Sequence, residues 1–231
     1  MNPEYYQRSA LLLGAQVQAR ASEARVLLFG VGGVGSWCAE ALVRSGIGHL
    51  TLVDADVVCP SNVNRQLMAT SATLGRPKTE ALRERLLEIN PEADITARTE
   101  RYCPDTADAF PLEQYHYILD CIDSRHDKML LIRRACESGR VFFSSMGAAL
   151  KMDPTKVRVC DFWHVEGDPL ARSLRKQLRR QGFEEHPFLC VCSEEEPLEA
   201  GRQDSVNGSL VTVTAAFGLA LASLVLRDLT K

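Results

Sequence analysis

The sequence has no C-x-x-C pair, although eight of its 231 residues are cysteine. Such pairs supply the ligands of most structural zinc ribbons, and the C-x-C of Cys190 and Cys192 is too short to replace one. We therefore expect no zinc. The opening residues lack the apolar core of a secretory signal peptide. The cysteines are thus expected to be free thiols in a reducing compartment, which predicts a cytoplasmic protein.

Positive charge is not in excess, because 27 Lys and Arg face 30 Asp and Glu. The net charge of −3 excludes a protein whose whole surface is basic, but it allows a local basic patch. Residues 205–226 carry no charge at all. They are long enough to cross a bilayer, which needs about 20 apolar residues, but they contain six Ser, Thr and Asn side chains. We expect a buried core or dimer-interface helix there, and no membrane span.

Residues 25–54 are the most informative stretch. An apolar run at 26–29 predicts a buried parallel strand, and residues 36–44 carry apolar side chains at helical spacing. Between them stand Gly30, Gly32, Gly33 and Gly35. Glycine permits a tight turn and lets a phosphate approach the N–H groups of the helix N-terminus. A second apolar strand follows and ends at Asp54, whose carboxylate can accept a hydrogen bond from a ribose hydroxyl.

A polar segment follows Asp54 and Asp56. Its side chains offer hydrogen-bond donors to phosphates, although Asn-rich turns are also common as simple connections. Lys78 then lies in the first turn of a helix predicted over residues 77–90. A cation there opposes the helix dipole unless an anion lies next to it, which favours a phosphate-binding role. The candidate nucleotide-binding residues of this region are Asp54, Asp56, Asn62, Asn64, Arg65, Gln66 and Lys78.

Two aspartates end the strand predicted at residues 115–120 and begin the next loop. Ligands gather at the carboxyl ends of parallel strands, so Asp120 and Asp123 are expected near the phosphates. One of them could hold Mg²⁺, which takes one or two carboxylates plus phosphate oxygens. Asp123 has a simpler alternative role as the N-cap of the helix predicted over residues 124–137.

The order of the elements predicts an α/β fold, with a Rossmann-like, mostly parallel sheet, helices on both faces and a partly antiparallel C-terminal extension. We expect one domain, 1–231, with a nucleotide-binding core at 1–150 and the extension at 151–231. The extension is predicted to hold a hairpin-like turn at 152–155, a basic helix at 169–181, a mobile loop at 184–204 and a terminal helix. The N-terminal helix at 3–19 is expected to point Leu11, Leu12 and Leu13 inward.

The helix at 169–181 carries five cations and no acidic residue. Asp168 can cap it, Pro169 suits its first position and Gly182 suits its end. A basic stripe indicates contact with RNA phosphates, and a solvated amphipathic helix is the equal alternative. The cations are Arg172, Arg175, Lys176, Arg179 and Arg180.

A glycine turn followed by an acid would also suit a dinucleotide dehydrogenase, but such an enzyme does not need Arg65, Lys78 and Asp123 around the same crevice. Two cations and a metal-binding acid are what a triphosphate needs when a nucleophile attacks its α-phosphorus. The constellation therefore predicts an enzyme that attacks the α-phosphorus of a nucleoside triphosphate bound with Mg²⁺.

The chain resembles the E1-type adenylating family, which includes the activators of sulfur-carrier proteins and of ubiquitin. The matching segments are GVGGVGS (30–36), LVDAD (52–56), SNVNRQ (61–66), GRPK (75–78) and DCIDS (120–124). The resemblance implies that Gly32 and Gly33 line the phosphate loop and that Asn64, Arg65 and Lys78 contact phosphates. It also implies that Asp123 holds Mg²⁺. Arg8, otherwise an ordinary solvated arginine, would reach the ATP of a partner subunit, which implies a homodimer.

The extension is similar to that of the branch of this family that dehydrates threonylcarbamoyladenosine in tRNA. DPLARSLRKQLRRQGF (168–183) and VTVTAAFGLALAS (211–223) carry this likeness. It implies that a tRNA anticodon loop is the substrate and that Cys190 is either a catalytic thiol or a structural one. The alternative is an activator of a small ubiquitin-like or sulfur-carrier protein. The sequence leaves open whether a sulfur-transfer protein is a further partner.

Overall fold

The structure is a computed structural model that describes residues 3–184, 186–204 and 206–231. Its centre is one sheet of seven strands in the order β3-β2-β1-β4-β5-β7-β6. Neighbouring strands are parallel except for the β6–β7 pair, which is antiparallel. This confirms the predicted fold class. The strands are β1 (Arg25–Phe29), β2 (His49–Val53), β3 (Asp94–Arg98), β4 (Tyr117–Asp120), β5 (Val141–Ser145), β6 (Val157–Asp161) and β7 (Leu189–Ser193).

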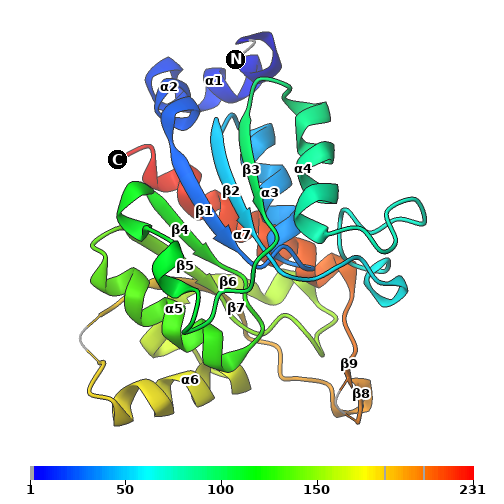
Figure 1. The fold of residues 1–231 in the computed structure, drawn as a ribbon. Helices are drawn as coiled ribbons and strands as arrows, with labels where there is room; N and C mark the ends of the chain where they lie inside the picture. The colour runs from blue at the N-terminus through cyan, green and yellow to red at the C-terminus, as the bar shows by residue number, and fades with distance from the viewer. Residues whose placement is uncertain (1–2, 185, 205) are drawn as a thin grey trace.

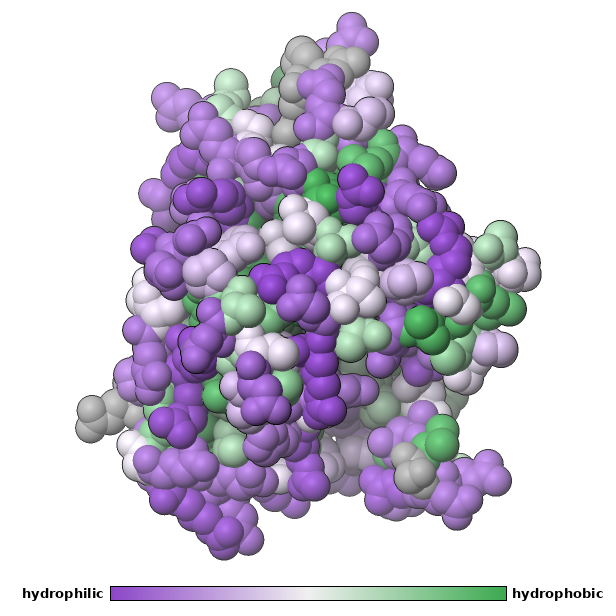
Figure 2. Space-filling model, viewed as in Figure 1, coloured by the Kyte–Doolittle hydropathy of each residue, from purple (hydrophilic) through white to green (hydrophobic). Residues whose placement is uncertain are grey.

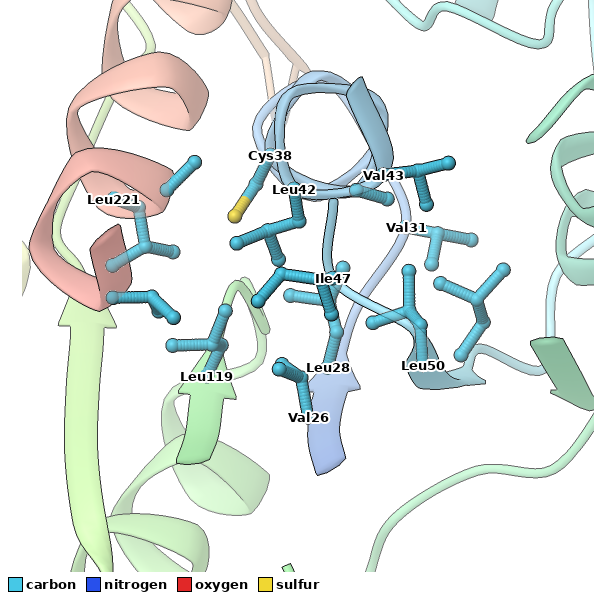
Figure 3. Close-up of a cluster of buried hydrophobic side chains, with 14 of the residues drawn as sticks. Val26, Leu28, Val31, Cys38, Leu42, Val43, Ile47, Leu50, Leu119 and Leu221 are labelled. Atoms are coloured by element: carbon cyan, nitrogen blue, oxygen red, sulfur yellow. The ribbon is translucent and has the colours of Figure 1, made fainter. Parts of the chain in front are cut away.

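Helices cover both faces of the sheet, because alternate strand residues point to opposite sides (Figure 1). Val26 and Leu28 of β1 pack in one core, and Leu27 and Phe29 pack in the other. The first core holds α2 (Ala15–Glu23), α3 (Gly35–Arg44), α4 (Lys78–Ile89) and α7 (Val211–Asp228). Its centre is drawn in Figure 3. The second core holds α5 (Arg125–Glu137) and α6 (Pro169–Arg180).

The terminal helix α7 packs closely on α3. A Cβ atom on Gly218 would lie 2.4 Å from the carbonyl oxygen of Val34, so only glycine allows this approach. Val213, Phe217 and Leu221 are buried in the first core. By length and composition α7 could cross a membrane, and 44% of it is buried in this structure. Length and composition alone are weak evidence for a membrane span, because core helices of soluble proteins can be equally long and apolar.

The structure corrects the expected order of the extension. The turn at 152–155 does not join two strands in a hairpin, because β5 and β6 do not pair with each other. Strand β7 lies between them, parallel to β5 and antiparallel to β6. The segment 184–204, predicted to be a mobile loop, therefore contains the interior strand β7 as well as β8 (Arg202–Gln203), which pairs with β9 (Val206–Asn207). Glu185 and Ser205 lie outside the described residues.

The N-terminal segment is also different from the prediction. It breaks at Gly14, whose φ is 89°, into α1 (Gln7–Leu13) and α2. Leu11 and Leu12 are 82% and 86% exposed, so the prediction that they point inward is wrong for the single chain. Leu13 is partly buried against the first core. In Figure 1 this segment lies at the top, next to the amino end of the chain.

Candidate functional site

A pocket of about 810 Å³ opens at the carboxyl ends of β1, β2, β4 and β5. This volume is within the range of small-molecule sites, and the position is where ligands bind in open α/β sheets. In Figure 2 the surface is hollowed between the lobe that carries β8 and β9 and the rest of the molecule. Val206 and Asn207 of β9 line the pocket.

The glycines have two different roles. Gly30, Gly32 and Gly33 line the pocket, as expected for a phosphate loop. Gly30 has a φ of 82°, and a Cβ there would lie 2.6 Å from the Cys121 carbonyl oxygen. Gly35 does not line the pocket, because it begins α3 and touches the carbonyl of Gly30, 1.8 Å from where its Cβ would be. Because Gly35 has no side chain, α3 can pack closely against the glycine turn. The role of Gly35 is therefore in packing and not in ligand contact.

Asp54 holds the glycine turn in place. Its Oδ2 accepts the Val31 N–H at 2.8 Å, and its Oδ1 accepts the Asp56 N–H at 2.9 Å. Burial raises the pKa of Asp54 and outweighs these hydrogen bonds and the nearby charge of Lys78. Asp54 also lines the pocket, and its contact with a ribose hydroxyl stays a prediction.

Lys78 lies in the pocket wall at the first position of α4. Its ammonium donates to Oδ2 of Asp56 at 2.7 Å, and its backbone N–H donates to the Asp56 carbonyl at 3.0 Å. The Asp56 carboxylate thus supplies the anion that a cation at a helix N-terminus requires.

The polar segment 61–66 divides into residues that face the pocket and residues that shape the loop. Arg65 and Gln66 line the pocket, and Oε1 of Gln66 is buried with no partner among the described residues. Asn62 instead accepts the Cys59 N–H through Oδ1 at 3.0 Å. Asn64 donates to the Ser209 carbonyl at 2.9 Å and accepts from Arg65 at 2.9 Å. Neither Asn62 nor Asn64 lines the pocket, and both amides fix the loop that carries Arg65, so a contact of either with phosphates stays a prediction.

The two candidate metal-binding aspartates are in different environments. Asp120 is fully buried in an ion pair with Lys128 at 2.8 Å and also accepts a hydrogen bond from Ser144 at 2.7 Å. Asp123 lines the pocket, and none of the described residues forms a hydrogen bond or ion pair with its carboxylate. The N-cap of α5 is Ser124, so the alternative role for Asp123 is also excluded. Of the two, only Asp123 is available to a metal ion bound with phosphate oxygens.

An ion pair that sequence reasoning missed lies in the same wall. Arg101 binds Oδ2 of Asp127 through Nε and Nη2, at 2.9 and 2.8 Å. Burial alone would raise the pKa of Asp127, but hydrogen bonds from Arg101 and His126 outweigh it and lower the pKa. Both Arg101 and Asp127 line the pocket. No local pattern marks Arg101, because it follows strand β3 in an irregular segment.

The other side of the pocket is formed by residues that the sequence did not single out. They are residues 145–149, a loop that begins at the last residue of β5, and Leu170 in the first turn of α6. The N-terminal end of the basic helix is therefore part of the pocket wall. The signal that could have found the loop is its position after a parallel strand, where ligands are expected.

Two of the predicted catalytic residues do not reach this pocket. Arg8 is exposed on α1 and does not line it. Cys190 is the second residue of β7, with a relative exposure of 0%, and packs in the second core. Hydrogen bonding with the sulfurs of Cys160 and Cys192, which favours the protonated Cys190 thiol, acts together with burial to raise the pKa of Cys190. A buried thiol of high pKa is a poor nucleophile, so the structure favours the structural role for Cys190.

Helix α6 matches its predicted bounds closely, with Asp168 as its N-cap and Gly182 at a φ of 70° after its end. Four of its cations are exposed: Arg172, Lys176, Arg179 and Arg180. Arg175 is different, because it donates to the Phe162 carbonyl at 3.0 Å and burial lowers its pKa. It is therefore a weaker candidate for a phosphate contact. The edge of the molecule where Figure 1 places α6 is mostly hydrophilic in Figure 2.

Known proteins share both this sequence and this fold. The chain is 36% identical over 193 residues to a tRNA threonylcarbamoyladenosine dehydratase of Bacillus subtilis, and the match spans 84% of this chain and 76% of the relative. It is 38% identical over 171 residues to the Escherichia coli protein of that name, covering 74% of this chain and 64% of the relative. The crystal structure of the Escherichia coli dehydratase with AMP has a TM-score of 0.92 and 34% identity, and the match covers 98% of this chain and 94% of that one.

A second crystal structure of the Escherichia coli dehydratase, solved with ATP, matches with the same TM-score of 0.92 over 98% of this chain. The sequence profile of the ThiF family covers residues 6–231, which include the glycine turn, Arg65, Lys78 and the C-terminal helix. A match over almost the whole length, joined to the same fold, shows that the chain belongs to the ThiF family.

Proposed function

We propose that this protein is an ATP-dependent dehydratase of tRNA that closes a ring in threonylcarbamoyladenosine through an acyl-adenylate. The observation that carries the proposal is one pocket at the strand ends that brings together the glycine turn, Arg65, Lys78 and Asp123. The relatives that share the extension support the same substrate, and one of them has been crystallised with ATP and with AMP.

In the first step an oxygen of the threonyl carboxylate attacks the α-phosphorus of ATP, and the bond to pyrophosphate breaks. Arg65 and Lys78 stabilise the negative charge that develops on the phosphate oxygens and on the leaving pyrophosphate. In the second step the substrate's own ureido group attacks the activated carbonyl, and AMP leaves. This step needs no external nucleophile, because both reacting groups belong to one molecule. The net change is the loss of one water.

The residues present fit a Mg²⁺ ion bound with the nucleotide. Asp123 offers a carboxylate that faces the pocket and pairs with none of the described residues, whereas Asp120 is already neutralised by Lys128. In the part of the chain that the structure describes, no group of three or more Cys, His, Asp and Glu side chains could hold a metal by itself. Asp123 would therefore share the ion with phosphate oxygens. Bound there, Mg²⁺ supplies charge neutralisation at the phosphates.

We further propose that the protein acts as a homodimer in which Arg8 completes the pocket of the partner subunit. Arg8 is exposed and does not line the pocket of its own chain. Leu11 and Leu12 lie on the same short helix and are almost fully exposed, which suits a surface that another subunit covers. All eight cysteines are free thiols, which fits the reducing cytoplasm in which tRNA is modified.

The proposal is tested by incubating the protein with ATP, Mg²⁺ and tRNA that carries the threonylcarbamoyl group, followed by digestion to nucleosides and mass spectrometry. The modified nucleoside is expected to lose the mass of one water, with one AMP formed for each ring. An unchanged mass would contradict the proposal. Pyrophosphate exchange that responds to a Gly-Gly-ended or sulfur-carrier protein, and not to tRNA, would instead support the activator function. A sulfur-transfer protein that raises turnover when added would be a further partner.

A further inference from the structure

The carboxylate of Asp168 connects two segments that both lie in the pocket wall. Its Oδ1 accepts the N–H of Ala171 at 2.9 Å, which caps helix α6. Its Oδ2 accepts the N–H of Gly147 at 2.9 Å, in the loop after β5. Asp168 itself is 2% exposed and does not line the pocket. One buried side chain thus fixes the distance between the loop and the basic helix.

The cap alone does not require this arrangement. Ser, Thr and Asn cap helices about as well as Asp, because a single oxygen is enough. Asp153 shows the simpler case in this chain, since it also precedes a proline and uses Oδ1 to cap the turn at Thr155. Asp168 differs because its second oxygen holds a residue 21 positions earlier in the chain.

The packing at Gly147 shows how close the two segments are. A Cβ on Gly147 would lie 3.2 Å from Oδ2 of Asp168, so the loop or the carboxylate would have to move by a few tenths of an ångström to accept a larger residue. On its other side the loop is held by the Met146 N–H, which donates to the Val191 carbonyl of β7 at 2.8 Å. The loop therefore has two anchors, one on the sheet and one on α6.

The position of the loop indicates which part of the reaction it serves. The glycine turn follows β1, Asp54 follows β2, and Lys78 is the first residue of α4. These residues line the nucleotide side of the pocket. Residues 145–149 and Leu170 line the pocket near the end of β5, which β4 separates from β1 on the side away from β2. Leu170 belongs to the helix that carries the exposed cations. The carboxylate that becomes adenylated would enter from this side if the tRNA lies along α6.

We propose that Asp168 is a positioning residue, which locks the 145–149 loop to the N-terminus of α6 so that tRNA docked on this helix presents its carboxylate to the nucleotide. The inference rests on the proposed function of the same pocket. Asp168 does not touch the reacting atoms, so its removal should impair turnover with tRNA and leave the nucleotide side of the pocket intact. A misplacement of about 1 Å in such a wall can reduce a rate by roughly 100-fold.

The test compares Asp168→Asn with Asp153→Asn, which makes the same chemical change at the other Asp-Pro cap. The amide in Asp168→Asn would keep an oxygen for one of the two N–H groups but cannot accept both. With the tRNA substrate we expect Asp168→Asn to lower kcat by between about 10-fold and 100-fold. The Kd of ATP should change by less than about twofold and the helix content should be unchanged. Asp153→Asn should behave as the wild type.

Gly147→Ala provides a second route to the same displacement if Asp168→Asn does not fold, and it should show the same split between kcat and ATP affinity. Unchanged kcat in a folded variant would overturn the positioning role and leave the proposed function standing, because the wild type still dehydrates tRNA. A loss of ATP affinity in parallel with kcat would also overturn it. A wild type without dehydratase activity would remove both proposals.

Discussion

The ammonium of Lys78 lies 2.7 Å from Oδ2 of Asp56, and the two side chains differ greatly in their freedom to move. The Lys78 side chain is 7% exposed, whereas that of Asp56 is 69% exposed. The cation is therefore held in the pocket wall beside an exposed carboxylate. Under the proposed function, Asp56 would keep Lys78 paired in the empty pocket and would turn toward solvent when a phosphate takes its place.

Lys78→Ala and Arg65→Ala are expected to lower the rate of ATP–pyrophosphate exchange by between about 100-fold and 1000-fold, as for other groups that stabilise transition-state charge. Stability should change by less than about 1 kcal/mol for Lys78→Ala, because its ion-pair partner is exposed. Arg76→Ala is the matched control, since Arg76 is close in sequence but pairs with Glu84 outside the pocket. A loss of thermal stability large enough to explain the lower exchange rate would contradict the phosphate role.

Asp123→Asn is expected to raise the Mg²⁺ concentration needed for half-maximal exchange by about 10-fold or more, because the amide is a weaker ligand than a carboxylate for a hard cation. The measurement is the exchange rate as a function of Mg²⁺ at fixed ATP. Asp108→Asn is the control, as Asp108 lies away from this pocket and pairs with Arg134. A Mg²⁺ dependence that stays the same in Asp123→Asn would exclude Asp123 as the ligand.

Charge reversal at Arg172 and Lys176 is expected to weaken tRNA binding and to lower the slope of log Kd against log salt, by about 1 for each phosphate that the helix no longer neutralises. ATP affinity should remain the same. Reversal of Arg140, which is exposed beyond the end of α5, should have little effect. Reversal of Arg175 should instead lower the melting temperature, because this side chain holds the Phe162 carbonyl. If tRNA affinity does not change in the first variant, α6 is a solvated surface helix.

Cys190→Ala is expected to keep most of the dehydratase activity, because the thiol is buried in the second core and its pKa is raised. The small cavity left by the sulfur should cost about 1 kcal/mol of stability. In the native wild-type protein, iodoacetamide near pH 8 should modify the exposed Cys59 well before Cys190, as mass spectrometry of tryptic peptides would report. Complete loss of activity in a folded Cys190→Ala protein would instead support a catalytic role for the Cys190 thiol.

Arg8→Ala is expected to be inactive alone and to regain activity when mixed with the inactive Lys78→Ala protein. In a mixed dimer one pocket would combine an intact Lys78 with an intact Arg8 from the partner. Such mixtures should recover up to about one quarter of the wild-type rate if subunits exchange freely, because half of the dimers are mixed and each has one intact pocket. Sedimentation of the mixture would establish that dimers form. Dimers without any recovered activity would argue against a shared pocket.

The sequence determined the parts of this protein that depend on neighbouring residues. The glycine turn is predictable from its own residues because it joins a strand directly to a helix. The ends of α6 are predictable from Asp168, Pro169 and Gly182. Lys78 stands out in the sequence because a cation at the start of a helix conflicts with the helix dipole. The prediction of one domain for residues 1–231 stays a prediction.

Only the tertiary structure decided the features that depend on distant segments. Strand β7 enters the sheet between β5 and β6, and no local pattern encodes which strand a short apolar run will join. That pairing buries Cys190 and turns an expected loop into core. The same long-range contacts direct Asn64 toward Ser209, neutralise Asp120 with Lys128 and join Asp168 to Gly147. Side chains of one type thus acquire different roles, because their partners come from parts of the chain that meet only after folding.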